Sequence, residues 1–586
     1  MFYVVDLPWG YKAPGVRYFA KDKIWVYEGN KLPANLVEFR APAFSRGRWL
    51  EDQLNGRVTP VIPGEVSFIP KPHQVDAAKK IALSYDAGWG GFILADRTGI
   101  GKTLSGLAGV ALVAKRRGFT NAKKAQVLIV CPKSVIPQWR QTIRNYIGAH
   151  KHLRFLILNY QQLQKLLSTP ESTKTAKRTK TKRRQTARDG APLIDFNFVI
   201  FDEAHKLKNY PSSNTSLAAV RVAQLDKVYK KDSSPFVIFS TATPGSTPLN
   251  LAVMSGILGR LLKPNAPRHI TPNQWGDFLI ANGFHVKKGK SGYSWVSLPW
   301  GIKESKDPKE LAAYKKALTA TQTKQRADTQ RIGKALTQKN APFIMRSPKN
   351  IAGWPEQQIV PMPVEMTPEQ TSLYAEAWTR FRNWLRLTPA KADPKGALVE
   401  TLRYRQKTSL LRIDAIADFA LDMIENDKQI YISCEFIDTV EKLKETFLKN
   451  KIPVSEISGR TSDQKEYERI AFQKGQTKVV LSTVVEGISL HAGEILPDGS
   501  KATSNDRITI LADIRQNPLD ALQTLGRAHR DGVNSIAYIP YLENTVDERI
   551  VNSFVNKVVN TEVMTGKKLE EALNLETIFR EAAEKN

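Results

Sequence analysis

Short apolar runs alternate with amphipathic stretches along most of this chain, and this alternation constrains the fold more than any other feature of the sequence. In the first part of the chain, helix-like stretches such as Thr103–Arg117 and Pro137–Tyr146 separate the runs. The runs themselves are Phe92–Ala95, Val127–Cys131, Phe155–Leu158, Phe198–Phe201 and Val237–Ser240. Because strands that alternate with helices form parallel βα units, this part of the chain predicts a parallel α/β sheet.

The same pattern returns later in the chain and predicts a second α/β block. An expected helix, Thr439–Asn450, follows the first of four apolar runs, which are Ile430–Cys434, Val454–Ile457, Val479–Thr483 and Ile508–Leu511. Helical stretches are expected between the blocks at Pro308–Thr337 and Pro368–Arg405. Residues 1–66 are punctuated by Pro and Gly, and the strand-like Val16–Ala20 and Lys23–Tyr27 indicate a separate unit there.

We therefore expect an α/β protein with two parallel-sheet lobes, helical protrusions and a small N-terminal accessory domain. At about 150 residues per domain, the 586 residues allow three to five units. The predicted bounds are 1–66 for the accessory domain, 67–345 for lobe 1, 346–427 for a linker with a helical protrusion, and 428–586 for lobe 2 with C-terminal helices. Lobe 1 would contain a basic loop at 168–192 and a helical insertion at about 262–340.

The positive charge of the chain is concentrated in one segment. The formal net charge is +30, and Arg97–Arg188 alone holds 21 Lys and Arg against one acid, Glu171. A field of this sign favours a polyanionic partner, and its concentration in one segment favours nucleic acid over a membrane surface. Thr169–Pro192 is poor in apolar residues and is expected to be a disordered loop. It could be a solvated tether or a basic arm that grips phosphates.

Cysteine usage and hydropathy limit the cellular setting. Two cysteines exclude a disulfide framework and a Cys-based zinc cluster, and both lie in strand-like apolar runs that predict burial. Met1–Pro8 lacks the basic start of a signal peptide, and no apolar stretch reaches the length of a membrane span. We expect a reducing cell interior.

Two segments at the ends of expected strands carry nucleotide chemistry. Asp96–Thr103 (DRTGIGKT) is a Gly-bearing loop between a strand and a helix, and its backbone amides could cradle phosphates. Lys102 would reach the β- and γ-phosphates, and Thr103 would hold Mg²⁺. Asp202 and Glu203 follow another strand, where an acidic pair could position Mg²⁺ and polarise the attacking water. Asp96 stands where the strict loop pattern has Gly.

In order along the chain, these segments resemble helicase superfamily 2, and most closely the SNF2 (Swi2/Snf2-like) DNA-dependent ATPases, over roughly residues 67–555. The similar segments of lobe 1 are Pro72–Gln74, Asp96–Thr103 (motif I), Leu128–Ser134 with Gln138-Trp139 (motif Ia), Asn159–Leu163, Asp202–Asn209 (motif II) and Ser240–Pro244 (motif III). Those of lobe 2 are Tyr431–Phe436, Gly459–Phe472, Leu481–Leu490 (motif V), Gln523–Arg530 (motif VI) and Thr545–Ile550. Motifs V and VI also resemble the strawberry-notch helicases. Ala242 departs from the usual Gly of motif III.

The resemblance implies two RecA-like lobes with ATP between them. The implied catalytic residues are Lys102, Asp202, Glu203, Arg527 and Arg530, with Arg530 as the arginine finger. The implied ATP-binding residues are Gln74, Asp96, Arg97, Thr98, Gly99, Ile100, Gly101, Lys102, Thr103, Gly487 and Gln523, and Thr103 and Asp202 would hold Mg²⁺. Contacts to DNA would come from Lys133, Tyr160, Lys208 and Thr483. Coupling between the ATP and DNA sites would involve His205, Thr241 and Thr243.

The implied function is a DNA-dependent ATPase that translocates on double-stranded DNA and remodels DNA structures or protein–DNA complexes. One alternative is a strand-separating DNA or RNA helicase, and another is a nucleic-acid-binding scaffold without hydrolysis. Nucleic acid, most simply duplex DNA, is the expected partner, a protein partner could bind through residues 1–66, and no membrane is involved. The expected location is the cytoplasm of a bacterial or phage-infected cell, in association with the nucleoid.

Overall fold

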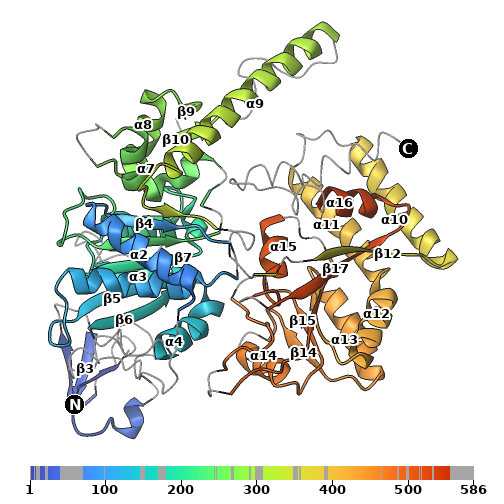
Figure 1. The fold of residues 1–586 in the computed structure, drawn as a ribbon, viewed down its shortest axis with the longest axis horizontal. Helices are drawn as coiled ribbons and strands as arrows, with labels where there is room; N and C mark the ends of the chain where they lie inside the picture. The colour runs from blue at the N-terminus through green and yellow to red at the C-terminus, as the bar shows by residue number, and fades with distance from the viewer. Residues whose placement is uncertain are drawn as a thin grey trace. The chain divides into compact units, whose positions relative to one another are not determined.

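The chain folds into two compact units, which Figure 1 shows as ribbons. The first comprises Met1–Asp96 and Gly101–Met345, and the second comprises Arg97–Ile100 and Arg346–Asn586. The computed structural model describes residues 2–5, 7, 13–19, 24–37, 39, 70–97, 99–145, 152–168, 180–242, 244–245, 247–264, 269–289, 292–296, 308–346, 351, 354–355, 358–387, 394–461, 464–484, 487–496, 500–513, 515, 518–530 and 533–554.

A six-stranded sheet, in the order β11-β4-β8-β7-β5-β6, forms the centre of the first unit. All of its strand pairs are parallel, as the alternation of strands and helices predicts. The strands are β4 (Gly91–Leu94), β5 (Ala125–Cys131), β6 (Leu153–Asn159), β7 (Phe198–Asp202), β8 (Phe236–Ser240) and β11 (Phe343–Ile344). In such a sheet the strands end at one common edge, so the loops after β4, β7 and β8 are brought together.

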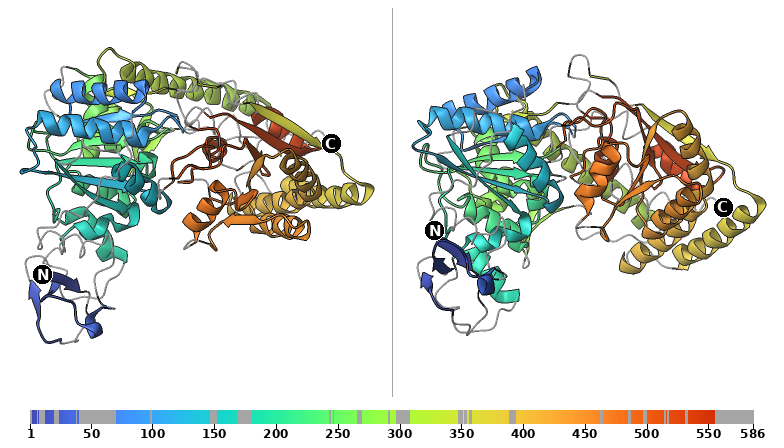
Figure 2. Two further views of the ribbon diagram at one scale, coloured as in Figure 1. Left: turned by 60° about the horizontal axis from the view of Figure 1, so that its bottom comes forward. Right: turned by 90° about the horizontal axis from the view of Figure 1, so that it is seen from below.

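Helices cover both faces of this sheet, because successive strand residues point to opposite sides. Phe198 and Ile200 of β7 belong to one core, while Val199 and Phe201 belong to the other. The first core is closed by α2 (Pro72–Asp86), α3 (Lys102–Arg116) and α4 (Ile136–Asn145). The second is closed by η3 (Tyr160–Leu166), α6 (Asn214–Val222), η6 (Pro248–Met254), α7 (Ser255–Leu262) and α8 (Trp275–Ala281). Figure 2 shows the two helical layers. Short 3-10 turns lie at η2 (Lys133–Val135), η5 (Ala204–Leu207) and η7 (Pro272–Gln274).

The helical insertion of the first unit is a hairpin bound to a long helix. The hairpin strands are β9 (Val286–Gly289) and β10 (Gly292–Trp295), and the helix is α9 (Pro308–Leu336). Asp328 of α9 is 4% exposed and accepts hydrogen bonds from the backbone N–H of His285 (2.8 Å) and from Trp295 Nε1 (3.0 Å). These contacts anchor α9 to the hairpin. The helix expected at Pro308–Thr337 is confirmed.

A small antiparallel sheet precedes lobe 1. It has the order β1-β3-β2, with β1 (Phe2–Val5), β2 (Val16–Phe19) and β3 (Ile24–Glu28), followed by η1 (Ala34–Leu36). Tyr3, Val5, Leu32 and Leu36 form its core. The strand pattern expected within residues 1–66 is therefore present, and residues 40–69 lie outside the described part of the chain.

Part of the predicted disordered loop is a helix, so that expectation is wrong for residues 180–189. The helix α5 (Lys180–Asp189) packs against α6, and its Ala187 is fully buried in a core of lobe 1. The backbone after it is fastened by the hydrogen bond from Ser168 N to Ala191 O (2.8 Å) and by a bridge between Leu167 and Pro192. The burial of Ala187 and these backbone bonds hold in place a segment whose composition predicts no fixed structure. Residues 169–179 lie outside the described part of the chain.

The second unit contains another six-stranded parallel sheet, in the order β12-β17-β16-β13-β15-β14. Its strands are β12 (Ile359–Val364), β13 (Gln429–Ser433), β14 (Val454–Ile457), β15 (Val479–Ser482), β16 (Arg507–Leu511) and β17 (Ser535–Leu542). Its helices are α10 (Pro368–Leu387), α11 (Pro394–Leu410), α12 (Ile413–Glu425), α13 (Ile437–Lys449), α14 (Lys465–Gln473), α15 (Pro518–Leu525) and α16 (Val546–Phe554). The stretch expected at Pro368–Arg405 is two helices, α10 and α11, and the second continues to Leu410.

Both cysteines are buried, as predicted: Cys131 ends β5, and Cys434 follows β13. In the part of the chain that the structure describes, no helix has both the length and the hydrophobicity to cross a bilayer.

Candidate nucleotide site

The loop between β4 and α3 has a backbone that only glycine adopts without strain at two positions. Gly99 has φ +92° and Gly101 has φ +94°, a region that L side chains disfavour. At Gly101 a side chain is excluded twice, because a Cβ there would lie 2.1 Å from Gln74 Nε2. The 15-residue helix α3 begins directly afterwards, at Lys102. Its first amides and the positive end of its dipole therefore face this loop, an arrangement suited to phosphate.

Lys102 and Gln74 both lie against this loop. Lys102 Nζ donates a hydrogen bond to the carbonyl oxygen of Asp96 (2.8 Å). Gln74 is 2% exposed, and its Oε1 accepts from Lys71 N (2.9 Å), which closes the first turn of α2. The structure therefore brings the expected glutamine beside the expected phosphate loop. Thr103 is the second residue of α3, and Thr98 lies outside the described residues.

Asp202, at the end of β7, is held by a hydrogen bond on each carboxylate oxygen. Trp139 Nε1 donates to Oδ2 (2.8 Å), and Ser240 Oγ donates to Oδ1 (3.1 Å). Burial raises the pKa of Asp202 to about 6, and repulsion from Glu203 adds to this effect, while the two donors and Lys102 oppose it. The carboxylate is thus fixed in position, and its charge is one that a bound cation would stabilise.

Glu203 continues from Asp202 with a left-handed backbone, at φ 56°. Such a conformation is uncommon for a residue with a side chain and marks local strain. Glu203 Oε2 lies 3.3 Å from His205 Nδ1, and this nitrogen lies 3.2 Å from Thr241 Oγ1. Thr241 N in turn donates to Leu94 O (3.0 Å), at the end of β4. A continuous set of contacts therefore joins the acidic pair to the strand that precedes the phosphate loop.

Two residues of this site were absent from the sequence-based selection. Trp139 is fully buried on α4, and Ser240 ends β8. Both lie within segments that carry the resemblance, Gln138-Trp139 and Ser240–Pro244, so a signal was present. That signal does not say which side chain they contact, because α4, β7 and β8 are far apart in the sequence. Thr243 lies outside the described residues.

The residues predicted to contact DNA fall into two groups. Lys133 and Lys208 are exposed, on η2 and just after η5. Tyr160, in contrast, is 4% exposed, and its hydroxyl donates to the carbonyl oxygen of Asp202 (2.7 Å). This placement favours a structural role for Tyr160 beneath the acidic pair over contact with nucleic acid. In the second unit, Thr483 follows β15, and its carbonyl accepts from Arg515 Nη2 (3.0 Å).

The second unit holds the residues expected to complete an ATP site. Arg527 is 4% exposed and donates through Nη1 to Ile488 O (3.3 Å), while its own carbonyl accepts from Leu490 N (3.0 Å). Arg530, three residues later in the chain, is half-buried. Gln523, on α15, is 4% exposed, and its Oε1 is buried with no hydrogen-bond partner among the described residues. Gly487 has φ +75°.

A triphosphate and a divalent cation fit the first unit. The loop at Gly99–Gly101 and the start of α3 supply amide donors, and Lys102 supplies a cation. Asp202 supplies a fixed carboxylate beside them, and Glu203 follows directly. Positioned donors, a metal-binding carboxylate and a second acid are the groups that phosphoryl transfer to water requires.

Comparison with protein families finds two domains in this chain. Residues 73–230 match the SNF2-related domain, and residues 412–532 match the helicase conserved C-terminal domain. The first match includes the phosphate loop and the acidic pair, and the second includes motifs V and VI. The SNF2 resemblance and the expected α/β architecture are confirmed.

Curated relatives are similar over parts of their length. An uncharacterized ATP-dependent helicase of Bacillus subtilis is 34% identical over 148 residues, 25% of this chain and 24% of that protein. Another, of Mycoplasma genitalium, is 23% identical over 512 residues, 82% of this chain and 40% of that protein. The DNA repair and recombination protein RAD54B of Gallus gallus is 28% identical over 155 residues, 25% of this chain and 16% of that protein. The chain thus spans less than half the length of these relatives.

Two solved structures are distantly similar. The Sulfolobus solfataricus SWI2/SNF2 ATPase core in complex with dsDNA is 16% identical, with 88% of this chain and 98% of that chain covered, at a TM-score of 0.31. The Pyrococcus furiosus Hef helicase domain is 13% identical, with 83% and 98% covered, at a TM-score of 0.37. These scores are low, and the fold assignment rests on the two parallel sheets and the two domain matches.

The raised pKa of Asp202 predicts the pH dependence of cation binding. Only the ionised carboxylate binds Mg²⁺, so affinity should fall as the pH drops through about 6, well above the ordinary pKa of Asp. Trp139→Phe removes a donor to the ionised carboxylate and should move this midpoint to higher pH. A hydrogen bond to a charged group is worth about 1.5–3 kcal/mol, which corresponds to roughly one to two pKa units.

The measurement is Mg²⁺–nucleotide affinity between pH 5 and 8. Trp89→Phe is the matched control, because the Trp89 ring packs under Arg260 (4.0 Å) and is not a partner of Asp202. A midpoint that stays in place, or moves to lower pH, in Trp139→Phe would contradict the assignment of Trp139.

Proposed function

We propose that this chain, which its two matched domains make a member of the SNF2-related helicases, is a DNA-dependent ATPase that translocates on double-stranded DNA and so remodels DNA structures or protein–DNA complexes. The observation that carries the proposal is the Asp202–Glu203 pair, fixed by Trp139 and Ser240 at the sheet edge that also bears the phosphate loop. A scaffold without hydrolysis has no need for a buried Asp202 followed by a Glu203 with strained backbone near Lys102.

In the proposed mechanism, lobe 1 binds and orients ATP. The triphosphate lies on the Gly99–Gly101 loop and the first turn of α3, and Lys102 leaves Asp96 O to contact the β- and γ-phosphates. Thr103 and Asp202 would hold Mg²⁺, which would neutralise charge on the phosphates. Glu203 orients the attacking water and accepts its proton. His205, 3.3 Å from Glu203, fixes the direction of that carboxylate.

Lobe 2 supplies the arginines. Arg530 stabilises the charge that develops on the γ-phosphate, and Arg527 lies beside it, held by Ile488 and Leu490. An arginine from the other lobe makes hydrolysis depend on lobe closure. Alternate closing and opening would then advance the protein along DNA.

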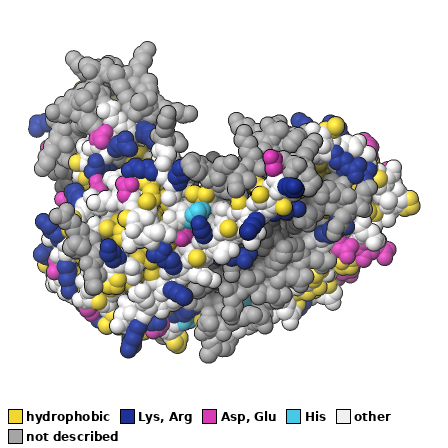
Figure 3. Space-filling view, turned by 90° about the horizontal axis from the view of Figure 1, so that it is seen from above, with side chains coloured by type: hydrophobic (Ala, Val, Ile, Leu, Met, Phe, Trp, Pro, Cys, Tyr) yellow, Lys and Arg dark blue, Asp and Glu magenta, His cyan; other side chains and the backbone are white. Residues whose placement is uncertain are grey.

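The proposed DNA contacts go to phosphates. Lys133 and Lys208 of lobe 1 are exposed, and Thr483 lies at the corresponding edge of lobe 2. On the face drawn in Figure 3, Lys and Arg side chains clearly outnumber acidic ones. Contacts to phosphate position a duplex without reading its sequence, so we expect little sequence preference.

Glu203→Gln should separate binding from chemistry. The amide keeps the size of the side chain but accepts no proton, so ATP turnover should fall by about 10²–10⁴-fold while ATP and duplex DNA still bind. Turnover is measured with saturating duplex DNA, and binding is measured by equilibrium titration. Glu445→Gln, at an exposed position on α13, is the control. ATP turnover in Glu203→Gln equal to that of the unaltered chain would contradict the mechanism.

The basic arm should contribute to the salt dependence of DNA binding. A deletion of residues 172–188 would also remove Ala187 from the core. Replacing basic side chains of the arm by neutral ones tests the charge without disturbing that core. In Lys174→Gln/Lys177→Gln/Arg178→Gln, the slope of log K against log salt should fall by up to about 2.7, since each phosphate contact contributes about 0.9.

The matched control removes three exposed cations from lobe 2, as Lys442→Gln/Lys449→Gln/Lys451→Gln. Equal slopes in the arm variant and this control would mean that the arm is only a tether.

A further inference from the structure

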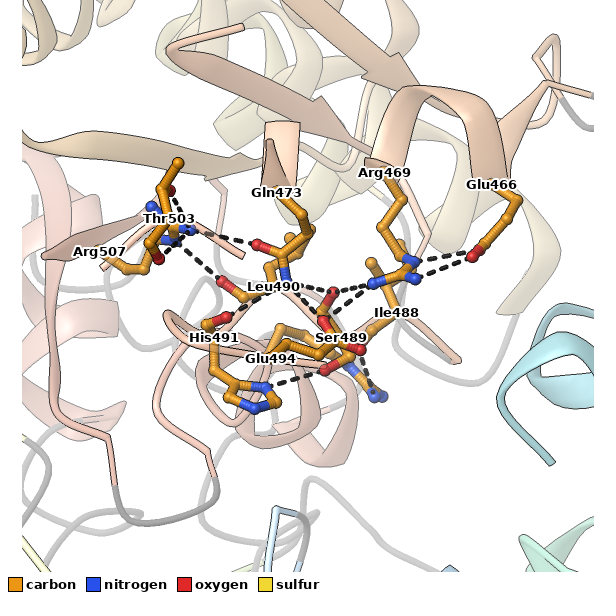
Figure 4. A network of polar contacts seen from close by, with 11 residues as sticks. Glu466, Arg469, Gln473, Ile488, Ser489, Leu490, His491, Glu494, Thr503 and Arg507 are labelled. Atoms are coloured by element: carbon orange, nitrogen blue, oxygen red, sulfur yellow. Dashed lines mark hydrogen bonds and ion pairs between the residues drawn. The ribbon is translucent and has the colours of Figure 1, made fainter. Parts of the chain in front are cut away.

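The loop that carries motif V is held by side chains at four consecutive carbonyl groups. We call Ile488–His491 the motif V loop. Its side-chain donors come from α14, β16 and motif VI, and Figure 4 shows those of α14 and β16 converging on it. The bonds are Arg527 Nη1 to Ile488 O (3.3 Å), Arg469 Nη1 to Ser489 O (3.2 Å), Arg507 Nε to Leu490 O (3.3 Å) and Gln473 Nε2 to His491 O (3.2 Å). Buried carbonyl groups need hydrogen-bond partners, and in this loop side chains supply them at four consecutive residues.

Arg469 uses both edges of its guanidinium group. Nε and Nη2 donate to the two carboxylate oxygens of Glu466 (3.0 and 2.8 Å), while Nη1 donates to Glu494 Oε2 (2.9 Å) as well as to Ser489. The Arg469 side chain is 8% exposed and that of Glu494 is 12% exposed. A planar fork makes all of these bonds at once, which a lysine ammonium on its flexible stem does not.

Arg507 is more deeply buried, at 1% exposed, and its hydrogen bonds go to neutral groups. Its partners are Leu490 O, Gln429 Oε1, Asn505 O, Gln473 Oε1, Thr503 O and Thr503 Oγ1. Burial lowers its pKa to about 10, and Glu494 opposes that shift. A cation in such a place is costly, and apolar packing would usually stabilise a core as well. What the guanidinium adds is therefore fixed geometry.

Gln473 joins the two arginines. It is fully buried at the end of α14. Its Oε1 accepts from Arg507 Nη2 (3.2 Å), and its Nε2 donates to Ser489 O (3.5 Å), to His491 O and to Glu494. Gln473 bonds Arg507 directly and shares Glu494 with Arg469, so the three side chains belong to one hydrogen-bonded unit under the loop. The loop itself also packs through Ile488 and Leu490 against Phe472 and Tyr431.

The same loop positions Arg527 from its other side. Arg527 donates to Ile488 O, and Leu490 N donates to Arg527 O (3.0 Å). We propose that Arg469, Gln473 and Arg507, here called the motif V brace, are positioning residues that hold the motif V loop, and through it Arg527, in the geometry required for ATP turnover. This inference rests on the proposed function, in which Arg527 lies beside Arg530, the arginine that stabilises the charge on the γ-phosphate.

A second buried arginine in the same unit provides a matched control. Arg412 is also 8% exposed and also binds two carboxylates, Asp513 (2.9 Å) and Asp547 (2.5 Å). Its remaining hydrogen bond goes to Ala512 O (3.0 Å), so it holds α12, β16 and α16 together without contacting the motif V loop. Arg469→Lys therefore breaks a buried fork that contacts the motif V loop. Arg412→Lys breaks the same kind of buried fork at a place where it does not contact that loop.

The experiment compares Arg469→Lys, Arg507→Lys and Arg412→Lys with the unaltered full chain. For each we measure the thermal unfolding midpoint, the affinity for duplex DNA, and kcat and KM for ATP with saturating duplex DNA. All three variants should lose thermal stability. Only the two brace variants should lose kcat, by about 10- to 100-fold, because small misplacement of a catalytic group has effects of this size. KM for ATP and DNA affinity should stay near those of the unaltered chain.

The outcomes separate this inference from the proposed function. Equal losses of kcat in Arg469→Lys, Arg507→Lys and Arg412→Lys would overturn the inference, because the brace would then be only a stabilising core. If the unaltered chain shows no DNA-stimulated turnover, the proposed function itself fails. Should Arg469→Lys not fold, Glu494→Gln tests the same claim with a milder change, and an unaltered kcat in both Glu494→Gln and Arg507→Lys would overturn it.

Discussion

The geometry of the candidate site in lobe 1 depends on the hydrogen bonds that hold the buried carboxylate of Asp202. Asp202 ends β7, where Trp139 reaches it from α4, Ser240 from β8 and the Tyr160 hydroxyl, through the Asp202 carbonyl, from η3. Four elements that are distant in sequence therefore meet at one residue. Burial raises the pKa of its carboxyl group, so a cation bound beside it would stabilise the ionised form.

The two lobes hold in place site residues of opposite charge. Lobe 1 fixes a carboxylate by neutral donors, and the strained backbone of Glu203 places a second acid directly beside it. Lobe 2 fixes a loop by three guanidinium groups, those of Arg469, Arg507 and Arg527, and all three residues are almost fully buried. In each lobe, buried hydrogen bonds therefore fix residues that the proposed mechanism uses, Asp202 in lobe 1 and Arg527 in lobe 2.

Local sequence pattern was sufficient for the elements that carry the site. The apolar run Phe198–Phe201 corresponds to β7, and Gly99 and Gly101 lie in a loop directly before α3, because strand periodicity and backbone permissiveness are local properties. The break between α10 and α11 was missed although the sequence signals it, because Pro389 and Pro394 stand between the two helical patterns and proline commonly ends or begins a helix. The helix α5 was missed because its stability comes from one buried alanine and from its packing on α6, which composition does not encode.

Side-chain partners were the least predictable part of the site. Trp139 and Tyr160 stand in recognisable motifs, yet their contact with Asp202 depends on how α4 and η3 cross the sheet. The bonds of Arg469 to Ser489 O and of Gln473 to Arg507 likewise join α14 to the motif V loop and to β16. Long-range register of this kind follows from packing in three dimensions and has no periodic signal in the sequence.

The central claim is that ATP hydrolysis by this chain is driven by double-stranded DNA. The most direct measurement is the rate of ATP turnover with duplex DNA, single-stranded DNA, forked DNA and RNA, each supplied in turn at the same nucleotide concentration. The account predicts strong stimulation by duplex and forked DNA and little by RNA. Turnover that responds to RNA or single strands alone, or to no nucleic acid at all, would contradict it.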